Sequence, residues 1–179
     1  FAIILMLVAI SPLLLIIAIL IKLQDRGPIL YSQTRVGKDG KNFNLYKFRS
    51  MIVNSEKNGP EWSKKEDPRI TPIGKIIRKL HIDEIPQMFN IIKGDIALVG
   101  PRPERPEFVK KLEKEIPFYH LRHIITPGFT GWAQIKFRYA GNVIDSKEKF
   151  EYDLYYLKNR NIFMDLGIIL RTIQIIFTH

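Results

Sequence analysis

The chain has 179 residues, the length of one ordinary domain with room for a buried core. Its 28 lysine and arginine residues outnumber 18 aspartate and glutamate residues, so the formal charge of +10 favours anionic partners: nucleic acid, anionic lipid or phosphorylated substrates. The absence of cysteine excludes a disulfide framework and a zinc site built on thiolates.

The first 21 residues, Phe1 to Ile21, carry no charge, and a helix needs about 20 apolar residues to cross the hydrocarbon core of a bilayer. We therefore expect a membrane segment over residues 1–23 and a separate domain over residues 24–179. A signal peptide is the competing interpretation, but the run is long for one and no small-residue cleavage site follows it. The excess of lysine and arginine after Lys22 predicts that the domain faces the cytoplasm.

Ser11 and Pro12 lie in the middle of this apolar segment. Proline removes a backbone donor and clashes with the preceding turn, so the helix should bend or break there. Two arrangements remain open from composition. One is a re-entrant helix that turns back, and the other is a kinked spanning helix in which a serine hydroxyl or a neighbour satisfies the freed carbonyl.

A β-hairpin is predicted next, with strands over residues 29–36 and 43–48 and an Asp-Gly turn between them. Lys47 and Arg49 fall on one face at the end of the second strand because side chains alternate along a strand. This pair is a candidate phosphate site. The alternative is a strand edge that charged side chains protect from pairing.

Residues 54–69 are polar and lack apolar periodicity, which predicts a long loop, and such loops are often lids. The apolar positions between Ile73 and Leu80 then recur at helical spacing, which predicts a short helix. Arg78 lies on the opposite, basic side of this helix and is a candidate phosphate ligand.

A second helix is predicted to open with Asp83 and Glu84, to hold Pro86 in its first turn and to stop at Gly94. Its expected buried face is Ile85, Met88, Phe89, Ile91 and Ile92. Asp83 has two compatible interpretations: an ordinary N-cap, and an anionic nucleophile at a helix end that attracts phosphates. Adjacent helical residues do not face each other, so Glu84 should have a different role.

A short apolar strand over residues 96–99 leads into Pro101, Arg102 and Pro103. The two prolines restrict the backbone on both sides of the arginine. A guanidinium held in this way suits bidentate phosphate recognition, and the alternative is a rigid surface turn with an incidental arginine. Another helix is predicted to follow and to end at Pro117.

The last third of the chain predicts two helices. The first opens with Asp145 to Glu148, which has the spacing of a capping box. The second, Ile162 to Phe177, is dense in apolar residues but carries Asp165, Arg171 and Gln174. These polar residues favour burial against lipid headgroups or in a core over crossing the membrane.

Several short motifs follow one another along the chain. They are Lys47 to Met51, His81 to Gln87, Gly94-Asp95, Leu98 to Pro103, Arg122-His123, Pro127 to Gln134 and Tyr152 to Tyr156. In this order they resemble the bacterial sugar transferases known as monotopic phosphoglycosyl transferases, and the central Ser-Pro of the apolar segment is similar to the re-entrant membrane helix of that family. The stretch 137–142 is nearer to the larger exopolysaccharide-initiating members, which carry upstream membrane helices, so we expect an upstream part before Phe1.

The resemblance implies a two-step reaction. Asp83 would attack the β-phosphate of a UDP-sugar, expel UMP and form a covalent phospho-sugar intermediate, and polyprenyl phosphate, such as undecaprenyl phosphate, would then accept the sugar phosphate. Mg²⁺ would contact Asp83, and Glu84 would orient Asp83 or the acceptor phosphate. Such chemistry depends on cations around the phosphates. The candidates are Lys47, Arg49, Arg78 and Arg102.

The expected fold is α+β, with an N-terminal re-entrant membrane helix, a small β-hairpin and several amphipathic interfacial helices around an active site at the membrane surface. Ser11, Pro12, Pro101 and Pro103 are its motif residues. The expected location is the bacterial inner membrane, cytoplasmic face, with lipids as partners and no nucleic acid. The product would initiate an exopolysaccharide, an O-antigen or a glycoconjugate. The sugar, the glycan pathway and a homo-oligomer remain open.

Two rival functions belong to other classes. A membrane-tethered basic binding module would show salt-sensitive binding and no turnover, but the chain has no recognisable nucleic-acid motif. A conventional glycosyl transferase would release UDP instead of UMP.

Overall fold

The computed structural model describes residues 2–56, 59, 67–137 and 142–178. The chain divides into two compact units, and each contains segments from distant parts of the sequence. The first unit is Phe1–Ser32 with Tyr46–Ile92, and the second is Gln33–Leu45 with Lys93–His179. Helices and two small two-stranded sheets make up the described residues, which confirms the predicted α+β class.

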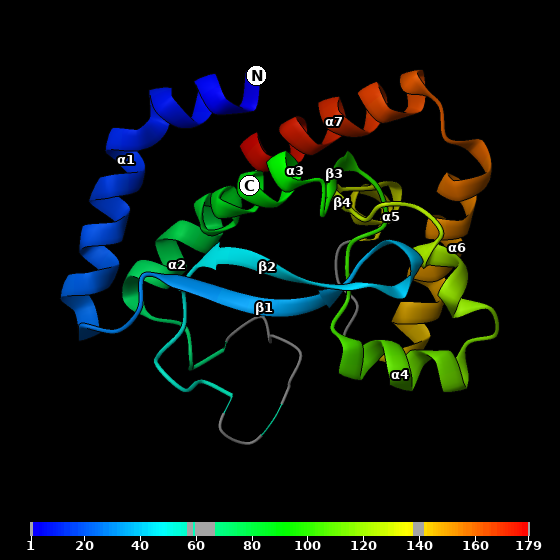
Figure 1. Cartoon of the computed structure of the whole chain (residues 1–179), viewed down its shortest axis with the longest axis horizontal. Helices are drawn as coiled ribbons and strands as arrows, with labels where there is room; N and C mark the ends of the chain where they lie inside the picture. Colours follow the sequence, from blue (N-terminus) through cyan, green and yellow to red (C-terminus); the bar gives the residue numbers. More distant parts are fainter. Residues whose placement is uncertain (1, 57–58, 60–66, 138–141, 179) are drawn as a thin grey trace. The chain divides into compact units, whose positions relative to one another are not determined.

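The first unit combines the long N-terminal helix, the open end of the β-hairpin and a run of short helices (Figure 1). Its elements are α1 (Ala2–Asp25), the outer ends of β1 (Leu30–Val36) and β2 (Asn42–Phe48), α2 (Pro72–Lys79), the 3-10 helix η2 (Ile82–Gln87) and α3 (Met88–Lys93). The closed end of the hairpin belongs to the second unit and contains the short turn η1 (Lys38–Gly40). Asp39 and Gly40 have left-handed φ angles of 54° and 72°, as the predicted Asp-Gly turn requires.

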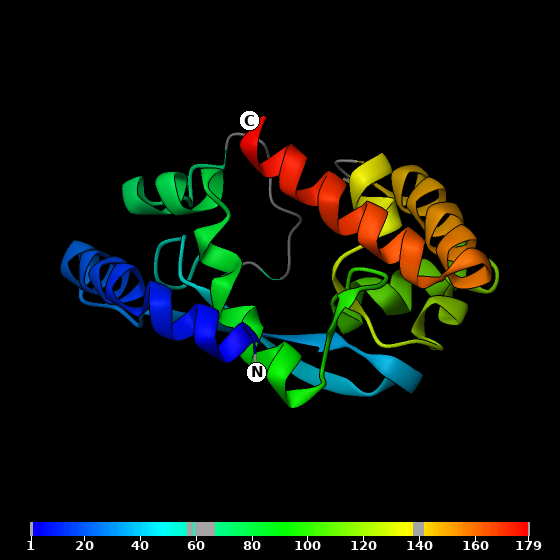
Figure 2. The ribbon, with the colours of Figure 1, turned by 90° about the horizontal axis from the view of Figure 1, so that it is seen from above.

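The predicted membrane helix forms as α1, which is long and apolar enough to cross a membrane by length and composition. Pro12 lacks the N–H that would bond to the carbonyl of Val8, and the Ser11 hydroxyl donates to that carbonyl instead, at 2.8 Å. The helix axis changes direction in its middle (Figures 1 and 2). The Ser-Pro pair therefore bends α1 without leaving the freed carbonyl unsatisfied.

One end of α1 is attached to the rest of the first unit by apolar packing. Ile17 and Ile21 of α1 are buried against Phe48 of β2 and Ile77 of α2. Most other apolar side chains of α1 are exposed, and Val8 keeps 65% of its surface accessible. One side of the C-terminal half of α1 thus belongs to a protein core, while the rest of the helix presents apolar surface.

Helix α2 begins against the chain that leaves β2. The Thr71 side chain caps it by accepting a hydrogen bond from Gly74 N at 2.9 Å, and the Thr71 backbone N–H donates to Ser50 O at 3.0 Å. A Cβ atom on Gly74 would lie 1.9 Å from Ser50 O, so only glycine permits this approach. The cap and the glycine together fix the start of the helix that carries Arg78.

The second unit packs four α-helices and a short parallel sheet around two apolar clusters (Figures 1 and 2). Its elements are β3 (Ala97–Val99), α4 (Pro106–Glu115), the 3-10 helix η3 (Tyr119–His123), β4 (Gly128–Thr130), α5 (Trp132–Lys136), α6 (Val143–Asn159) and α7 (Ile162–Phe177). Strands β3 and β4 are parallel, with Ala97 opposite Gly128 and Val99 opposite Thr130. One cluster centres on Tyr119 and Phe150, and the other on Tyr156 and Ile168.

The predicted bounds of α7 are confirmed, and this helix has two apolar sides. Ile168 is fully buried in the second unit. The exposed large apolar residues on the same helix are Ile162, Phe163, Leu166, Leu170, Ile173 and Ile176. Lipid contact along this side of α7 stays a prediction.

Two details of the sequence interpretation change. The predicted capping box at Asp145 is wrong, because Asn142 caps α6 by accepting a hydrogen bond from Asp145 N at 2.8 Å, and the helix begins at Val143. Most of the predicted loop over residues 54–69, and residues 138–141 of the 137–142 motif, lie outside the described residues.

Three glycines of the second unit bring backbone segments into direct contact. A Cβ atom on Gly128 would lie 2.1 Å from Gly100 N, and one on Gly131 would lie 2.1 Å from Gly100 O. These neighbours are backbone atoms, so they cannot move aside as a flexible side chain would. The close approach of the backbone at the ends of the parallel strands β3 and β4 therefore depends on the absence of side chains at these glycines.

We expect Gly128→Ala to lower the free energy of unfolding by roughly 1–3 kcal/mol or more, because an extra methyl group in a filled space forces the backbone apart. Thermal unfolding of the detergent-purified protein measures this effect. Gly167→Ala is the matched control, since Gly167 is exposed on α7 and an added Cβ meets nothing within 4 Å. The control should leave the midpoint unchanged or raise it, since alanine favours a helix over glycine. Equal midpoints for the two variants would contradict the packing argument.

Candidate active site

Asp83 lies in the 3-10 helix η2 and not at an N-cap. His81 occupies the N-cap position with a left-handed φ of 54°, and its carbonyl accepts from Glu84 N at 3.3 Å. The prediction that an α-helix opens at Asp83 is therefore wrong, since α3 begins only at Met88. The predicted stop is confirmed, because Gly94 has a φ of +81°.

The Asp83 side chain is buried, with 8% of the residue exposed. Within residues 2–56, 59, 67–137 and 142–178, no group donates a hydrogen bond to its carboxylate. Burial raises the pKa of the Asp83 carboxyl, and the neighbouring Glu84 raises it further. The cations Lys47 and Arg78 act on this pKa in the opposite direction. Asp83 is thus a buried carboxyl group whose charge the fold compensates only in part.

Glu84 is engaged differently from its neighbour. Its Oε1 accepts a hydrogen bond from Lys47 Nζ at 2.6 Å, and both side chains are mostly buried. This contact joins η2 to the end of β2. The two adjacent carboxylates thus have different contacts, and their different roles stay a prediction.

Asn90 fixes β2 beside the carboxylates, and the sequence interpretation missed it. Its Oδ1 accepts from the backbone N–H of Tyr46 at 3.1 Å, and the residue is fully buried. The predicted buried face of this helix is partly wrong, since Phe89 and Ile92 are exposed. A polar amide within an otherwise apolar helical stretch was the available signal for Asn90.

Arg49 lies two residues beyond Lys47 but has other partners. Its guanidinium donates to both carboxylate oxygens of Asp25, with Nη1 at 2.6 Å from Oδ2, and its Nε donates to Pro28 O at 2.6 Å. A Cβ atom on Gly27 would lie 2.7 Å from Arg49 Nη1. Arg49 therefore ties the end of α1 to β2, and its role toward a phosphate stays a prediction without support from these contacts.

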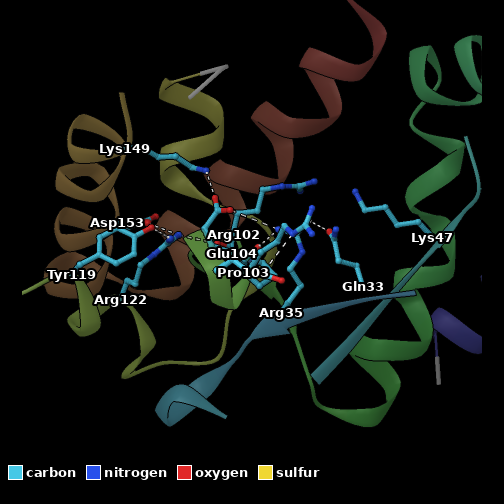
Figure 3. Close-up of polar contacts among 12 residues, drawn as sticks. Gln33, Arg35, Lys47, Arg102, Pro103, Glu104, Tyr119, Arg122, Lys149 and Asp153 are labelled. Carbon is cyan, nitrogen blue, oxygen red and sulfur yellow. Dashed lines mark hydrogen bonds and ion pairs between the residues drawn. The ribbon is translucent and has the colours of Figure 1, made fainter. Parts of the chain in front are cut away.

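Arg102 belongs to the second unit, where it lies half-buried between the buried prolines Pro101 and Pro103. The neighbouring Glu104 takes part in a group of charged side chains that the sequence interpretation missed (Figure 3). Glu104 accepts from Lys149 Nζ at 3.1 Å and lies 3.6 Å from Arg35 Nη1. Burial alone would raise the pKa of Glu104, but the surrounding cations lower it to about 2.

Arg122 is the most buried cation of this group, with 3% of the residue exposed. Its Nη2 lies 2.8 Å from Asp153 Oδ2, and its Nη1 donates to the Tyr119 hydroxyl at 2.5 Å. Burial opposes the charge of Arg122, but the acidic groups around it hold its pKa above the ordinary value. Arg122 had entered the sequence interpretation only as part of a family motif.

The carboxylate oxygens of Asp83 suit a magnesium ion that also binds substrate phosphates. Among the described residues, no three or more His, Cys, Asp or Glu side chains gather to hold a metal. Mg²⁺ is commonly held by one or two carboxylates together with substrate phosphates. A buried carboxylate without a hydrogen-bond donor fits such a role, and Asp83 provides it.

We expect Asp83→Asn to raise the midpoint of thermal unfolding at neutral pH. A carboxyl whose pKa is raised by folding destabilises the folded state above that pKa, and this penalty is absent below the ordinary pKa near 4, where both states are protonated. Asparagine has nearly the same shape and no charge. Unfolding curves of both proteins between pH 4 and pH 8 measure the difference, which should shrink as the pH falls. A variant less stable than the wild type at pH 7 would contradict the claim that the ionised Asp83 carboxylate destabilises the folded state.

Comparison with known proteins identifies relatives over the whole chain. The model of the family described as "Bacterial sugar transferase" matches residues 1–179. A UDP-N-acetylgalactosamine-undecaprenyl-phosphate N-acetylgalactosaminephosphotransferase from Aeromonas hydrophila is 50% identical over 168 residues, which cover 94% of this chain and 40% of the relative.

Two further relatives are similar in the same way. A putative undecaprenyl-phosphate N-acetylgalactosaminyl 1-phosphate transferase from Bacillus subtilis (strain 168) is 52% identical over 111 residues, which cover 62% of each chain. An undecaprenyl-phosphate glucose phosphotransferase from Komagataeibacter xylinus is 41% identical over 178 residues, which cover 96% of this chain and 33% of the relative. This chain thus spans between 33% and 62% of the length of the three relatives.

Proposed function

Because this chain belongs to the bacterial sugar transferase family, we propose that it transfers a sugar 1-phosphate from a UDP-sugar to undecaprenyl phosphate. The observation that carries the proposal is the buried Asp83 carboxylate, which has no hydrogen-bond donor in the described part of the chain. A carboxylate in this state keeps its lone pairs available for attack on phosphorus. The names of the relatives, which include undecaprenyl-phosphate phosphotransferases, support the same reaction class.

The proposed reaction has two displacements at one phosphorus atom. First, an Asp83 carboxylate oxygen bonds to the β-phosphorus of the UDP-sugar, and the bond from this phosphorus to the bridging oxygen breaks, so UMP leaves. A phosphate oxygen of undecaprenyl phosphate then bonds to the same phosphorus, and the bond to Asp83 breaks. The product is undecaprenyl diphosphate sugar, and Asp83 is restored as a carboxylate.

The side chains near Asp83 have distinct proposed roles. Phosphoryl transfer depends mainly on positioning and on stabilising negative charge. Lys47 and Arg78 both act electrostatically on Asp83, so their positive charges also favour phosphate oxygens at this place. Glu84 holds Lys47 in position through their 2.6 Å contact. Arg102, in the second unit, is proposed to contribute its guanidinium to a substrate phosphate.

Magnesium would add positive charge to this set. When bound to Asp83, Mg²⁺ would neutralise phosphate oxygens as a Lewis acid. The residues of the chain itself bind the phosphates, orient the carboxylate and stabilise its charge.

Attachment to the bacterial inner membrane, with the catalytic residues on the cytoplasmic face, is part of the proposal. The apolar N-terminal half of α1 and the exposed apolar side of α7 support lipid contact. The bend at Ser11 and Pro12 supports a re-entrant course for α1. The product would then be the first lipid-linked unit of an exopolysaccharide, an O-antigen or another glycoconjugate.

We expect the detergent-purified protein to release UMP from one UDP-sugar in a panel of N-acetylgalactosamine, N-acetylglucosamine, glucose and galactose derivatives, with undecaprenyl phosphate present. N-acetylgalactosamine is the first candidate because two relatives carry it in their names. Asp83→Asn should reduce release by at least about a thousandfold, since it removes the attacking group. Chromatographic separation of UMP from UDP measures the reaction.

The controls separate the possible reasons for failure. Asp83→Asn must remain folded, which the unfolding curves described above establish independently. Chelation by EDTA should stop release, and added Mg²⁺ should restore it. Release of UDP would replace the proposal with ordinary glycosyl transfer, and binding of UDP-sugars without any nucleotide release would favour a binding module.

A further inference from the structure

The backbone between β3 and α4 accepts four hydrogen bonds from three elements: β1, η3 and β4. Residues 101–105 form no regular secondary structure, and two of them are prolines without an N–H. Their carbonyls nevertheless have partners at four consecutive positions. Pro101 O accepts from Gly128 N at 2.9 Å, Arg102 O from Arg122 Nη2 at 2.8 Å, Pro103 O from Arg35 Nη1 at 3.0 Å and Glu104 O from Val36 N at 2.9 Å.

These contacts determine the direction of one side chain. A peptide unit is planar, so a hydrogen bond to its carbonyl orients the whole plane. Gly128 orients the plane before the Cα atom of Arg102, and Arg122 orients the plane after it. With both planes fixed, tetrahedral geometry leaves a single direction for the Cα–Cβ bond of Arg102.

The two arginine donors are themselves held by an acidic and a neutral partner each (Figure 3). Arg122 contacts Asp153 and Tyr119, and Arg35 contacts Glu104 and Gln33. Desolvation offsets much of the attraction within a buried ion pair, so such a pair is weak evidence for a role in stability alone. A rigid fork with several N–H donors, however, can hold a carboxylate and a backbone carbonyl at the same time. Lysine, as a point charge, cannot reproduce this geometry.

We propose that Arg122 and Arg35 are positioning residues that hold the backbone of Arg102 so that its guanidinium meets the substrate phosphate. This inference rests on the proposed function, because it assigns Arg102 to a phosphate. Neither Arg122 nor Arg35 needs to touch the substrate in this arrangement. Both act through the carbonyl groups at positions 102 and 103.

A double-mutant cycle on UMP release tests the proposal. Arg122→Lys and Arg35→Lys keep the charge but lose the fork, and each is measured in the wild-type protein and together with Arg102→Ala. We expect each lysine variant to lower kcat/KM about tenfold in the wild-type background, mainly through KM, and less than about twofold once Arg102 is alanine. A merely structural role would give equal factors in both backgrounds.

The matched control is Arg160→Lys, at an exposed arginine that follows α6 and lies outside this group. It should leave kcat/KM unchanged in both backgrounds.

Equal losses for Arg122→Lys with and without Arg102 would overturn the positioning role and leave the proposed function intact. No loss from Arg102→Ala would overturn the positioning role together with the phosphate role of Arg102, while absence of UMP from the wild type would overturn the proposed function itself. If Arg122→Lys does not fold, as its unfolding curve would show, the partly exposed Arg35 decides the proposal.

Discussion

Burial of the Asp83 carboxylate is the constraint around which the first unit is organised. An anion withdrawn from water without a hydrogen-bond donor destabilises the folded state, so the surrounding fold must supply compensation. Lys47 and Arg78 supply positive charge from two different elements, β2 and α2. The Thr71 cap and Asn90 then hold these elements in place. In the proposed reaction, the same incomplete compensation that destabilises the fold would leave the Asp83 carboxylate reactive.

Local patterns in the sequence predicted most elements well. The hairpin, the bounds of α7 and the stop of α3 at Gly94 follow from alternation, apolar periodicity and glycine. The prediction failed where two neighbouring polar residues could each have been the N-cap of the same helix. Asn142 and Asp145 are both good N-cap residue types, and the helix begins after Asn142. At η2, the left-handed backbone of His81 ends one helix and starts the next, which helix propensity does not encode.

The candidate site was predictable only in part for a related physical reason. Asp83 and Glu84 stand out because carboxylates next to a proline-marked helix start are visible in a short window. The contacts of Arg49 with Asp25, and of Arg122 with the Arg102 carbonyl, join residues about 20 positions apart and depend on tertiary structure. An arginine that binds a carboxylate and one proposed to bind a phosphate look alike in a sequence, so their contacts become visible only in the fold.

The two cations at the end of β2 have a mechanical consequence. Lys47 holds Glu84, and Arg49 holds the end of α1. Two residues of an extended strand span about 7 Å, and a strand is stiff over that length. The last turn of the apolar helix and the Glu84 carboxylate are therefore attached to two neighbouring points of one short, stiff segment. A detergent or lipid that shifts the end of α1 would therefore also shift Lys47. The choice of detergent should then affect the site around Glu84 as well as the solubility of the protein.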